Sequence, residues 1–217
     1  MDKDCEDEED GIKAILIGDC GVGKTNLINT CAGLEFEDMK KPTISGSSIE
    51  KIININNSEY SVNLWDTAGQ EAYRGVTKLF FRGSNIVILV YDITQHVTFE
   101  SLKQWVDECK ELITEKFIFG VVGNKNDLFL DKEVSEEEGK TFAASINCKH
   151  KLVSAKSDPQ SFVDFLTELV GEFVKLDNRK GRKPIKLNNS MEKNDDSTGC
   201  GGWFSKLFKK NKNNNKK

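Results

Sequence analysis

Long apolar runs are missing from this 217-residue sequence, and none approaches the roughly 18 to 20 residues needed to cross a bilayer. The first ten residues, MDKDCEDEED, also lack the basic and then apolar pattern of a secretory signal. We therefore expect a chain that neither spans a membrane nor is exported.

Histidine is scarce, with two residues, and the six cysteines form no C-x-x-C pair. The sequence therefore supports neither a zinc site nor a disulfide framework. Because no export signal is visible, we expect reduced cysteines and a cytoplasmic location. No internal repeat is apparent.

The net charge of -4 conceals three unequal parts. Residues 1–10 carry seven acidic side chains and one lysine, whereas residues 177–217 carry twelve basic and four acidic side chains, a net +8. The intervening body is acidic. A basic end on an acidic body favours an anionic partner such as a membrane surface or nucleic acid.

Short aliphatic runs alternate with longer amphipathic stretches. The runs typical of buried parallel strands are 14–17, 86–90 and 117–122, and the stretches with helical spacing are 99–113 and 162–174. Residues 47–65 instead predict an antiparallel hairpin that turns at Asn56, Asn57 and Ser58. We therefore expect a three-layer α/β fold.

Periodicity ends near Asp177, and the remaining residues have too little apolar surface to fold alone. We expect an acidic disordered arm at 1–10, one folded domain at 11–176, and a basic tail rich in Asn and Lys at 177–217.

The segment from Gly18 to Thr25, GDCGVGKT, fits G-x-x-x-x-G-K-[ST] between a predicted strand and a predicted helix. Such a loop lets backbone N–H groups and the helix N-terminus bind phosphate oxygens. Lys24 is expected to contact the β- and γ-phosphates, and Thr25 to bind Mg²⁺. The other predicted nucleotide-binding residues of the loop are Asp19, Cys20, Gly21, Val22 and Gly23.

Two further segments follow predicted strands. In WDTAGQE, Asp66 is positioned to hold Mg²⁺, Gly69 to offer its N–H to a γ-phosphate, and Gln70 to orient an attacking water. In Asn124-Lys125-Asn126-Asp127, the Asp127 carboxylate can accept hydrogen bonds from guanine N1–H and its 2-amino group, which adenine does not supply. Residues Ser154, Ala155 and Lys156 are expected to complete the base pocket.

These motifs, with LVYDIT at 89–94 and FFRG at 80–83, resemble the Ras superfamily of small GTPases and in particular its Rab branch, over residues 11–176. The resemblance implies a P-loop GTPase fold with a six-stranded, mostly parallel sheet, one antiparallel edge strand and helices on both faces. It also implies that Thr43 joins Mg²⁺ and senses the γ-phosphate, and that Phe36 stacks on guanine.

The implied activity is a GTP/GDP switch in vesicle trafficking that hydrolyses GTP slowly with Mg²⁺. Lys24, Thr43, Gly69 and Gln70 are the implied catalytic residues, and the implied partners are an exchange factor, an activating protein and effectors. Two alternatives remain: a GTP-binding scaffold with little or no hydrolysis, and a phosphotransferase acting on a small molecule, which Asp127 disfavours.

The sequence departs from the Rab pattern at two places. Ser48 stands where Rabs have a phenylalanine that forms an effector-binding cluster, while Trp65 and Phe81 match its other members. Ordinary Rab effectors are therefore expected to bind poorly. The only tail cysteine, Cys200, lies 17 residues from the end, so the usual prenylation is not supported.

Residues 203–210, WFSKLFKK, place bulky apolar residues on one arc of a helix and lysines on the other. This pattern predicts a short helix that binds an anionic membrane surface, placing the protein peripherally on the cytosolic face of endomembranes. A partner-binding motif and an unused tail are the alternatives, and no nucleic-acid partner is expected.

Overall fold

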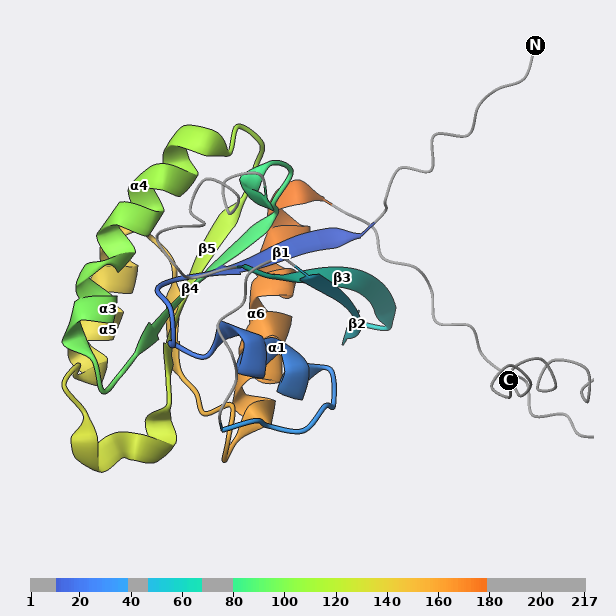
Figure 1. Ribbon diagram of the computed structural model, residues 1–217. Helices are drawn as coiled ribbons and strands as arrows, with labels where there is room; N and C mark the ends of the chain where they lie inside the picture. The colour runs from blue at the N-terminus through green and yellow to red at the C-terminus, as the bar shows by residue number, and fades with distance from the viewer. Residues whose placement is uncertain (1–10, 39–46, 68–79, 179–217) are drawn as a thin grey trace, which may run out of the picture. The chain divides into compact units, whose positions relative to one another are not determined.

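The computed structural model describes residues 11–38, 47–67 and 80–178. The chain divides into two units, Met1–Pro184 and Ile185–Lys217, and every described residue belongs to the first. These residues form a six-stranded sheet with helices on both faces, as predicted (Figure 1). No described helix is long and apolar enough to cross a membrane.

The sheet has the strand order β2-β3-β1-β4-β5-β6. Strand β2 runs antiparallel to β3, and the other neighbouring strands pair in parallel. The strands are β1 (Ile12–Ile17), β2 (Ser47–Ile55), β3 (Ser58–Asp66), β4 (Ile86–Asp92), β5 (Ile118–Asn124) and β6 (Lys149–Leu152). The predicted hairpin is confirmed: Asn56 and Asn57 both have positive φ, 50° and 61°, as tight two-residue hairpin turns require.

The helices are α1 (Lys24–Cys31), α3 (His96–Glu100), α4 (Leu102–Leu112), α5 (Glu136–Ser145) and α6 (Pro159–Asp177), with a 3₁₀ helix at Asn126–Asp131. The stretch predicted as one helix at 99–113 therefore forms parts of two helices that meet at Ser101. Helix α6 is longer than predicted, because the Asp158 side chain caps its start and Asn178, with φ 52°, ends it. Helix α5 was not predicted.

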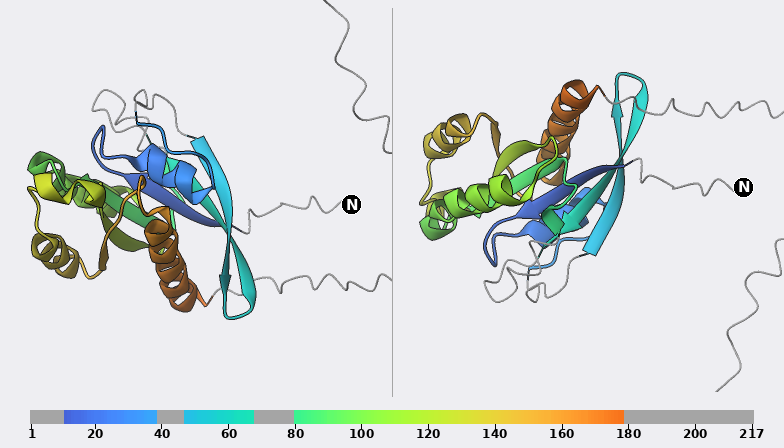
Figure 2. Two further views of the ribbon diagram at one scale, coloured as in Figure 1. Left: turned by 90° about the horizontal axis from the view of Figure 1, so that it is seen from below. Right: turned by 90° about the horizontal axis from the view of Figure 1, so that it is seen from above.

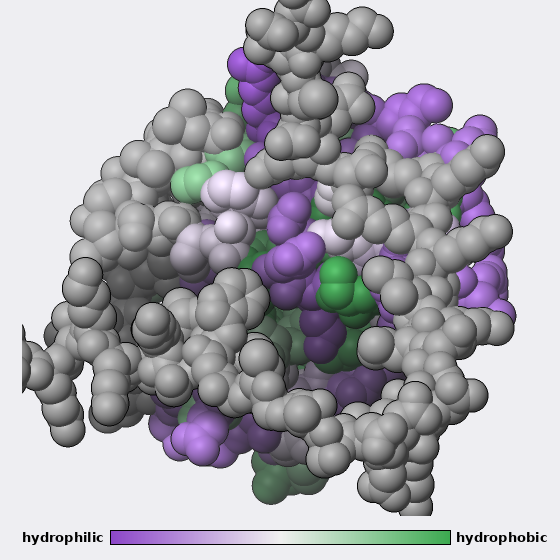
Figure 3. Space-filling model, turned by 90° about the vertical axis from the view of Figure 1, so that its right-hand side faces the viewer, coloured by the Kyte–Doolittle hydropathy of each residue, from purple (hydrophilic) through white to green (hydrophobic). Residues whose placement is uncertain are grey.

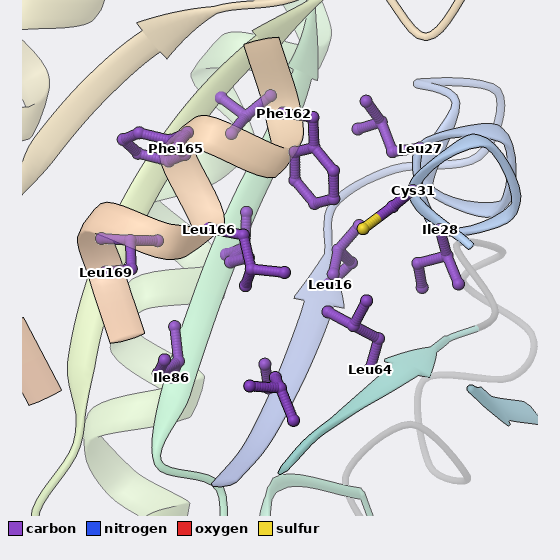
Figure 4. Packing of buried hydrophobic residues seen from close by; sticks show 14 of the residues in the cluster. Leu16, Leu27, Ile28, Cys31, Leu64, Ile86, Phe162, Phe165, Leu166 and Leu169 are labelled. Atoms are coloured by element: carbon purple, nitrogen blue, oxygen red, sulfur yellow. The ribbon is translucent and has the colours of Figure 1, made fainter. Parts of the chain in front are cut away.

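The alternation of side chains along β1 divides the core between the two faces of the sheet. Helices α1 and α6 cover one face of the sheet (Figure 2). Leu16 faces them, and Leu27, Phe162 and Leu166 pack against it in one buried cluster (Figure 4). Ile17 belongs to the opposite cluster, to which α4 contributes Trp105 and α5 contributes Ala143. Because both faces are covered, β1, β4 and β5 are almost continuously apolar.

Candidate functional site

The carboxyl ends of the five parallel strands bring separate loops to one edge of the sheet. In the register, Leu16 on β1 pairs with Asp66 on β3, and Asp92 on β4 pairs with Asn124 on β5. The loops that follow these strand ends carry the motifs predicted from the sequence. Ligands of open α/β sheets bind at such an edge.

The phosphate loop connects β1 to α1 through three glycines with positive φ: Gly18 at 146°, Gly21 at 82° and Gly23 at 95°. A Cβ added at Gly18 would collide with the Val90 carbonyl oxygen, so the loop runs directly against β4. A Cβ added at Gly21 would meet no atom within 4 Å, so the backbone there borders open space.

Helix α1 begins without a side-chain cap, and no acidic residue lies in its first turn. The first N–H groups of a helix have no partner within the helix, and its N-terminus carries partial positive charge. The start of α1 is therefore suited to an anion.

Lys24 brings a buried ammonium group to the same loop. Its side chain is 5% exposed, and Nζ donates to the carbonyl oxygens of Gly18 and Asp19, each at 2.8 Å. Burial lowers the pKa of Lys24 to about 8, although the nearby carboxylates of Asp66 and Asp19 act to raise it. Because the hydrogen bonds of this buried cation go to neutral carbonyls and its pKa is still lowered, a phosphate would further stabilise its charged form.

Thr25 and Asp66 place two oxygen ligands side by side. Thr25 Oγ1 donates to Asp66 Oδ2 at 2.8 Å, and Asp66 is 3% exposed. Beyond Asp66, the Thr67 hydroxyl donates to the Leu16 carbonyl at 2.6 Å and fastens the chain to β1. Hydroxyl and carboxylate oxygens are the ligands that Mg²⁺ prefers, so these residues fit that ion.

Asn124 joins two loops through one buried side chain. Its Nδ2 donates to the Val22 carbonyl at 2.9 Å, and its Oδ1 accepts from the Ala155 N–H at 3.3 Å. The side chain is 2% exposed. The phosphate loop and the loop after β6 are therefore held at a set separation.

Ser154 organises the loop that was predicted to contact the base. Its hydroxyl donates to Asp127 Oδ1 at 2.5 Å and accepts from the N–H groups of Lys156 and Ser157. The Asp127 carboxylate is thereby oriented from one side, which leaves its other oxygen for a ligand.

Lys125 has a left-handed backbone, with φ 66°, and its ammonium group lies 2.6 Å from Asp92 Oδ2. Asp92 Oδ1 accepts from both the N–H and the hydroxyl of Thr94. This role of Asp92 was not predicted from the sequence. The sequence did contain a signal for such a role, because Asp92 is an acidic residue at the end of an otherwise apolar strand.

Phe36 and Lys156 meet although they are far apart in the sequence. Lys156 Nζ lies 5.5 Å from the centre of the Phe36 ring and 2.8 Å from Asp38 Oδ1. Phe36 is partly buried against the cluster on the α1 and α6 face. Both predicted base-pocket residues are thus brought to one place.

Another unpredicted contact reaches the phosphate loop from α4, where Trp105 Nε1 donates to Asp19 Oδ1 at 3.0 Å. Of the remaining predicted loop residues, Cys20 is exposed and Val22 is fully buried. Thr43, Gly69 and Gln70 lie outside the described residues, as do the acidic arm at 1–10 and residues 179–217 of the predicted tail.

The structure corrects the aromatic cluster predicted around Trp65. Phe81 is fully buried in the core and cannot form part of an exposed surface. Its neighbour Phe80 contacts Trp65, with ring centres 5.4 Å apart. Consecutive residues of a helical turn point about 100° apart, so adjacent phenylalanines reach different environments. Ser48 is exposed and lies opposite Trp65 across the hairpin.

In the view of Figure 3, the described residues that remain visible are mainly hydrophilic, with hydrophobic residues in smaller areas between them.

Comparisons with known proteins identify the family of this chain. The sequence profile of the Ras family matches residues 13–173. The chain is 35% identical over 173 residues to Ras-related protein RABA6b of Arabidopsis thaliana, covering 77% of this chain and 76% of that protein. It is 38% identical over 168 residues to Ras-related protein Rab11B of Nicotiana tabacum, covering 76% and 77%.

Ras-related protein Rab-11C of Dictyostelium discoideum is 36% identical over 167 residues, covering 76% of this chain and 75% of that protein. With the family profile spanning nearly the whole described fold, the motifs, the sheet order and these relatives lead to one assignment. The chain belongs to the Ras family and is a Rab-like small GTPase of vesicle trafficking.

Proposed function

We propose that the edge formed by the phosphate loop, Asp66 and the loops after β5 and β6 binds GTP and GDP through the residues predicted from the sequence. The observation that carries this proposal is the Asn124 side chain, which bonds to the phosphate loop and to the loop after β6. A ligand that contacts both loops must have a charged end and a separate polar end. A nucleotide has both.

In this proposal the backbone N–H groups from Asp19 to Gly23 and the start of α1 bind the phosphates. Lys24 contributes the buried positive charge. Thr25 and Asp66 would hold Mg²⁺, with Thr43 added when GTP is bound. The ion supplies positive charge that offsets the negative charge developing on the transferred phosphoryl group.

Asp127 selects guanine by accepting from N1–H and the 2-amino group, and Ser154 keeps its carboxylate in that orientation. The Ala155 N–H faces the guanine 6-oxo group. Phe36 and Lys156, which contact each other, would together cover the base. An adenine would leave the carboxylate without its two donors, which is costly in a partly buried site.

Hydrolysis is proposed to use Gln70 to position water for in-line attack, while Lys24 stabilises the developing charge. Thr43 and Gly69 would contact the γ-phosphate and release when it is lost, which changes the surface that partners recognise. Intrinsic turnover should be slow because the resemblance places no arginine of this chain at the reacting phosphate. An activating protein would supply that charge.

Base selectivity tests the binding assignment. We expect Asp127→Asn to weaken GDP binding by at least about a hundredfold and to shift preference toward xanthosine diphosphate, because the amide presents a donor where guanine also donates. Competition against fluorescent GDP with GDP, XDP and ADP measures this shift. The matched control is Asp131→Asn on the exposed end of the same 3₁₀ helix, which should bind like the wild type. Unchanged guanine selectivity in Asp127→Asn contradicts the proposal.

Single-turnover hydrolysis tests the catalytic assignment. We expect Gln70→Leu to slow the loss of γ-phosphate from bound GTP by between about tenfold and a hundredfold, with GDP affinity unchanged. An unchanged rate would show that Gln70 does not position the water. A wild-type chain that binds GTP but does not hydrolyse it would favour the scaffold alternative.

We also propose that residues 203–210 bind an anionic membrane surface and place the protein on the cytosolic face of endomembranes. Eight residues are too few to hold a helix in water, so the segment would fold on the lipid surface. Each lysine near anionic lipid contributes about 1 kcal/mol, and the apolar arc contributes burial.

A further inference from the structure

Trp105 and Asp19 are joined by a hydrogen bond across 86 positions of sequence, in which indole Nε1 donates to Asp19 Oδ1 at 3.0 Å. The indole lies on α4 and is 1% exposed. Asp19 lies in the phosphate loop, directly after Gly18. A residue of the hydrophobic core therefore reaches the loop that is proposed to bind phosphate.

Asp19 carries a second bond through its main chain. Its carbonyl oxygen accepts from Lys24 Nζ at 2.8 Å, next to the equivalent bond to the Gly18 carbonyl. The side chain of Asp19 is thus held by the core while its main chain holds the loop lysine. Any movement of the Asp19 peptide would move one of the two oxygens that orient Lys24.

The support behind Trp105 is rigid. Leu102, Val106 and Cys109 of the same helix are buried in the cluster that also contains Ile17, the last residue of β1. A close-packed core does not deform continuously, so the indole N–H is a fixed point. Its acceptor is a carboxylate oxygen, and hydrogen bonds to charged groups are stronger than neutral ones.

The Asp19 carboxylate also acts on Lys24 through its charge. Burial lowers the pKa of Lys24, and the charge of Asp19 is among those that raise it. The indole bond keeps this carboxylate at the loop, although Asp19 is only partly buried.

We infer that Trp105 is a positioning residue for nucleotide binding: its indole N–H fixes Asp19, and through the Asp19 carbonyl it fixes Lys24 in the orientation that receives the phosphates. The inference rests on the proposed function of the phosphate loop. It assigns to α4, which reaches the loop through Trp105, control over how long a nucleotide stays bound.

Nucleotide release from the full chain tests this role with Trp105→Phe, which keeps an aromatic ring in the core but removes the donor. We expect fluorescent GDP to dissociate about tenfold faster from Trp105→Phe and from Asp19→Ala, and the double variant to be no faster than either. Asp19→Asn retains an oxygen acceptor but loses the charge, so GDP should dissociate from it faster than from the wild type and more slowly than from Asp19→Ala.

Two further measurements separate positioning from loss of stability. Val170→Ala removes packing from α6 on the opposite face of the sheet, so it should lower the melting temperature and leave GDP dissociation unchanged. In nuclear magnetic resonance spectra, the Trp105 indole N–H signal should shift strongly in Asp19→Ala and little in Asp19→Asn.

Three results would overturn the inference: wild-type GDP release from Trp105→Phe, additive effects in the double variant, or faster release in Val170→Ala that matches its lost stability. Failure of the proposed function looks different. In that case the wild-type chain itself does not bind GDP, and the indole signal still reports whether the Trp105–Asp19 bond exists.

Discussion

The ammonium group of Lys125 lies 2.6 Å from Asp92 Oδ2, so the last residue of β4 secures the loop that follows β5. Asp92 is 1% exposed, whereas about a third of the Lys125 side chain reaches solvent. The pair explains how Lys125 is kept in a left-handed backbone conformation, which costs a residue other than glycine about 1 kcal/mol.

Removing the Asp92 charge should loosen this loop. We expect Asp92→Asn to lower the free energy of unfolding by about 1 to 3 kcal/mol, less than for a fully buried pair because Lys125 can be hydrated. GDP should also dissociate faster, by about tenfold, because Asp127 lies two residues beyond Lys125. Urea unfolding and fluorescent-GDP release measure the two effects.

The control for Asp92→Asn is Glu136→Gln, which removes the exposed pair with Lys140 on α5. Exposed pairs of this kind contribute about 0.5 kcal/mol or less, and nucleotide release should be unaffected. If both substitutions changed the free energy of unfolding and the GDP dissociation rate equally, the burial of Asp92 would not make its ion pair stronger than an exposed one.

Stability of the nucleotide-free protein should rise with pH through the titration of Lys24. The pKa is about 8 in the folded chain and 10.5 in the reference state, so between these values the unfolded chain binds more protons. The cost of burying the charged ammonium is fully present below pH 8 and is relieved as the pH approaches 10.5. Relative to Lys24→Met, we expect the wild type to gain about 2 to 3 kcal/mol from pH 7.5 to 10.

Urea unfolding at a series of pH values measures this gain for both chains. Bound GDP should flatten the difference, because its phosphates stabilise the charged form of Lys24. A difference between the wild type and Lys24→Met that does not change with pH would contradict the assignment of a lowered pKa.

Two helical glycines should respond in opposite directions to alanine. At Gly139 in α5 an added Cβ would meet His150 Nε2 and would lie 2.7 Å from the Tyr91 hydroxyl, which itself bonds to His150. We expect Gly139→Ala to destabilise by about 1 to 3 kcal/mol despite its higher helix propensity.

At Gly171 in α6 the nearest atom to an added Cβ would be Ile55 Cδ1 at 3.8 Å, an ordinary contact. Gly171→Ala should therefore stabilise by about 0.5 to 1 kcal/mol. Thermal unfolding of both variants measures these changes. Stabilisation by Gly139→Ala would mean that the atoms around Gly139 move aside easily, and destabilisation by Gly171→Ala would contradict the expected gain in helix propensity.

Membrane binding by the tail predicts a dependence on both lipid charge and residues 203–210. The full chain should sediment with vesicles that contain anionic lipid and much less with neutral vesicles, while a chain ending at Gly199 should remain in solution with both. Raising the salt concentration should weaken the binding. Equal sedimentation of the two chains would rule out this anchor.

The nucleotide-binding motifs could be predicted because each has residues with particular backbone requirements and each directly follows a predicted strand. The two asparagines at the hairpin turn, the glycines of the phosphate loop and the aliphatic strands each carry a signal within a few residues. Helix α5 had such a signal as well: Ser135 and Glu138 form a capping box, with the Ser135 hydroxyl accepting from the Glu138 N–H. Its mostly polar sequence made the helix easy to miss.

Contacts between distant residues could not be predicted in the same way. Trp105 was predicted only as a helical core residue, and no local pattern shows that one edge of its ring faces a loop 86 positions away. The choice between Phe80 and Phe81 failed for a related reason, since which of two adjacent rings is buried depends on helix orientation rather than composition.

Asn124 has an evolutionary consequence because its amide serves two loops at once. Any replacement must supply both a donor for the Val22 carbonyl and an acceptor for the Ala155 N–H from one short side chain. A substitution of Asn124 would therefore affect the phosphate loop and the base-binding loop together. A lineage that changed its preferred base would have to do so through Asp127 or Ser154 and leave Asn124 alone.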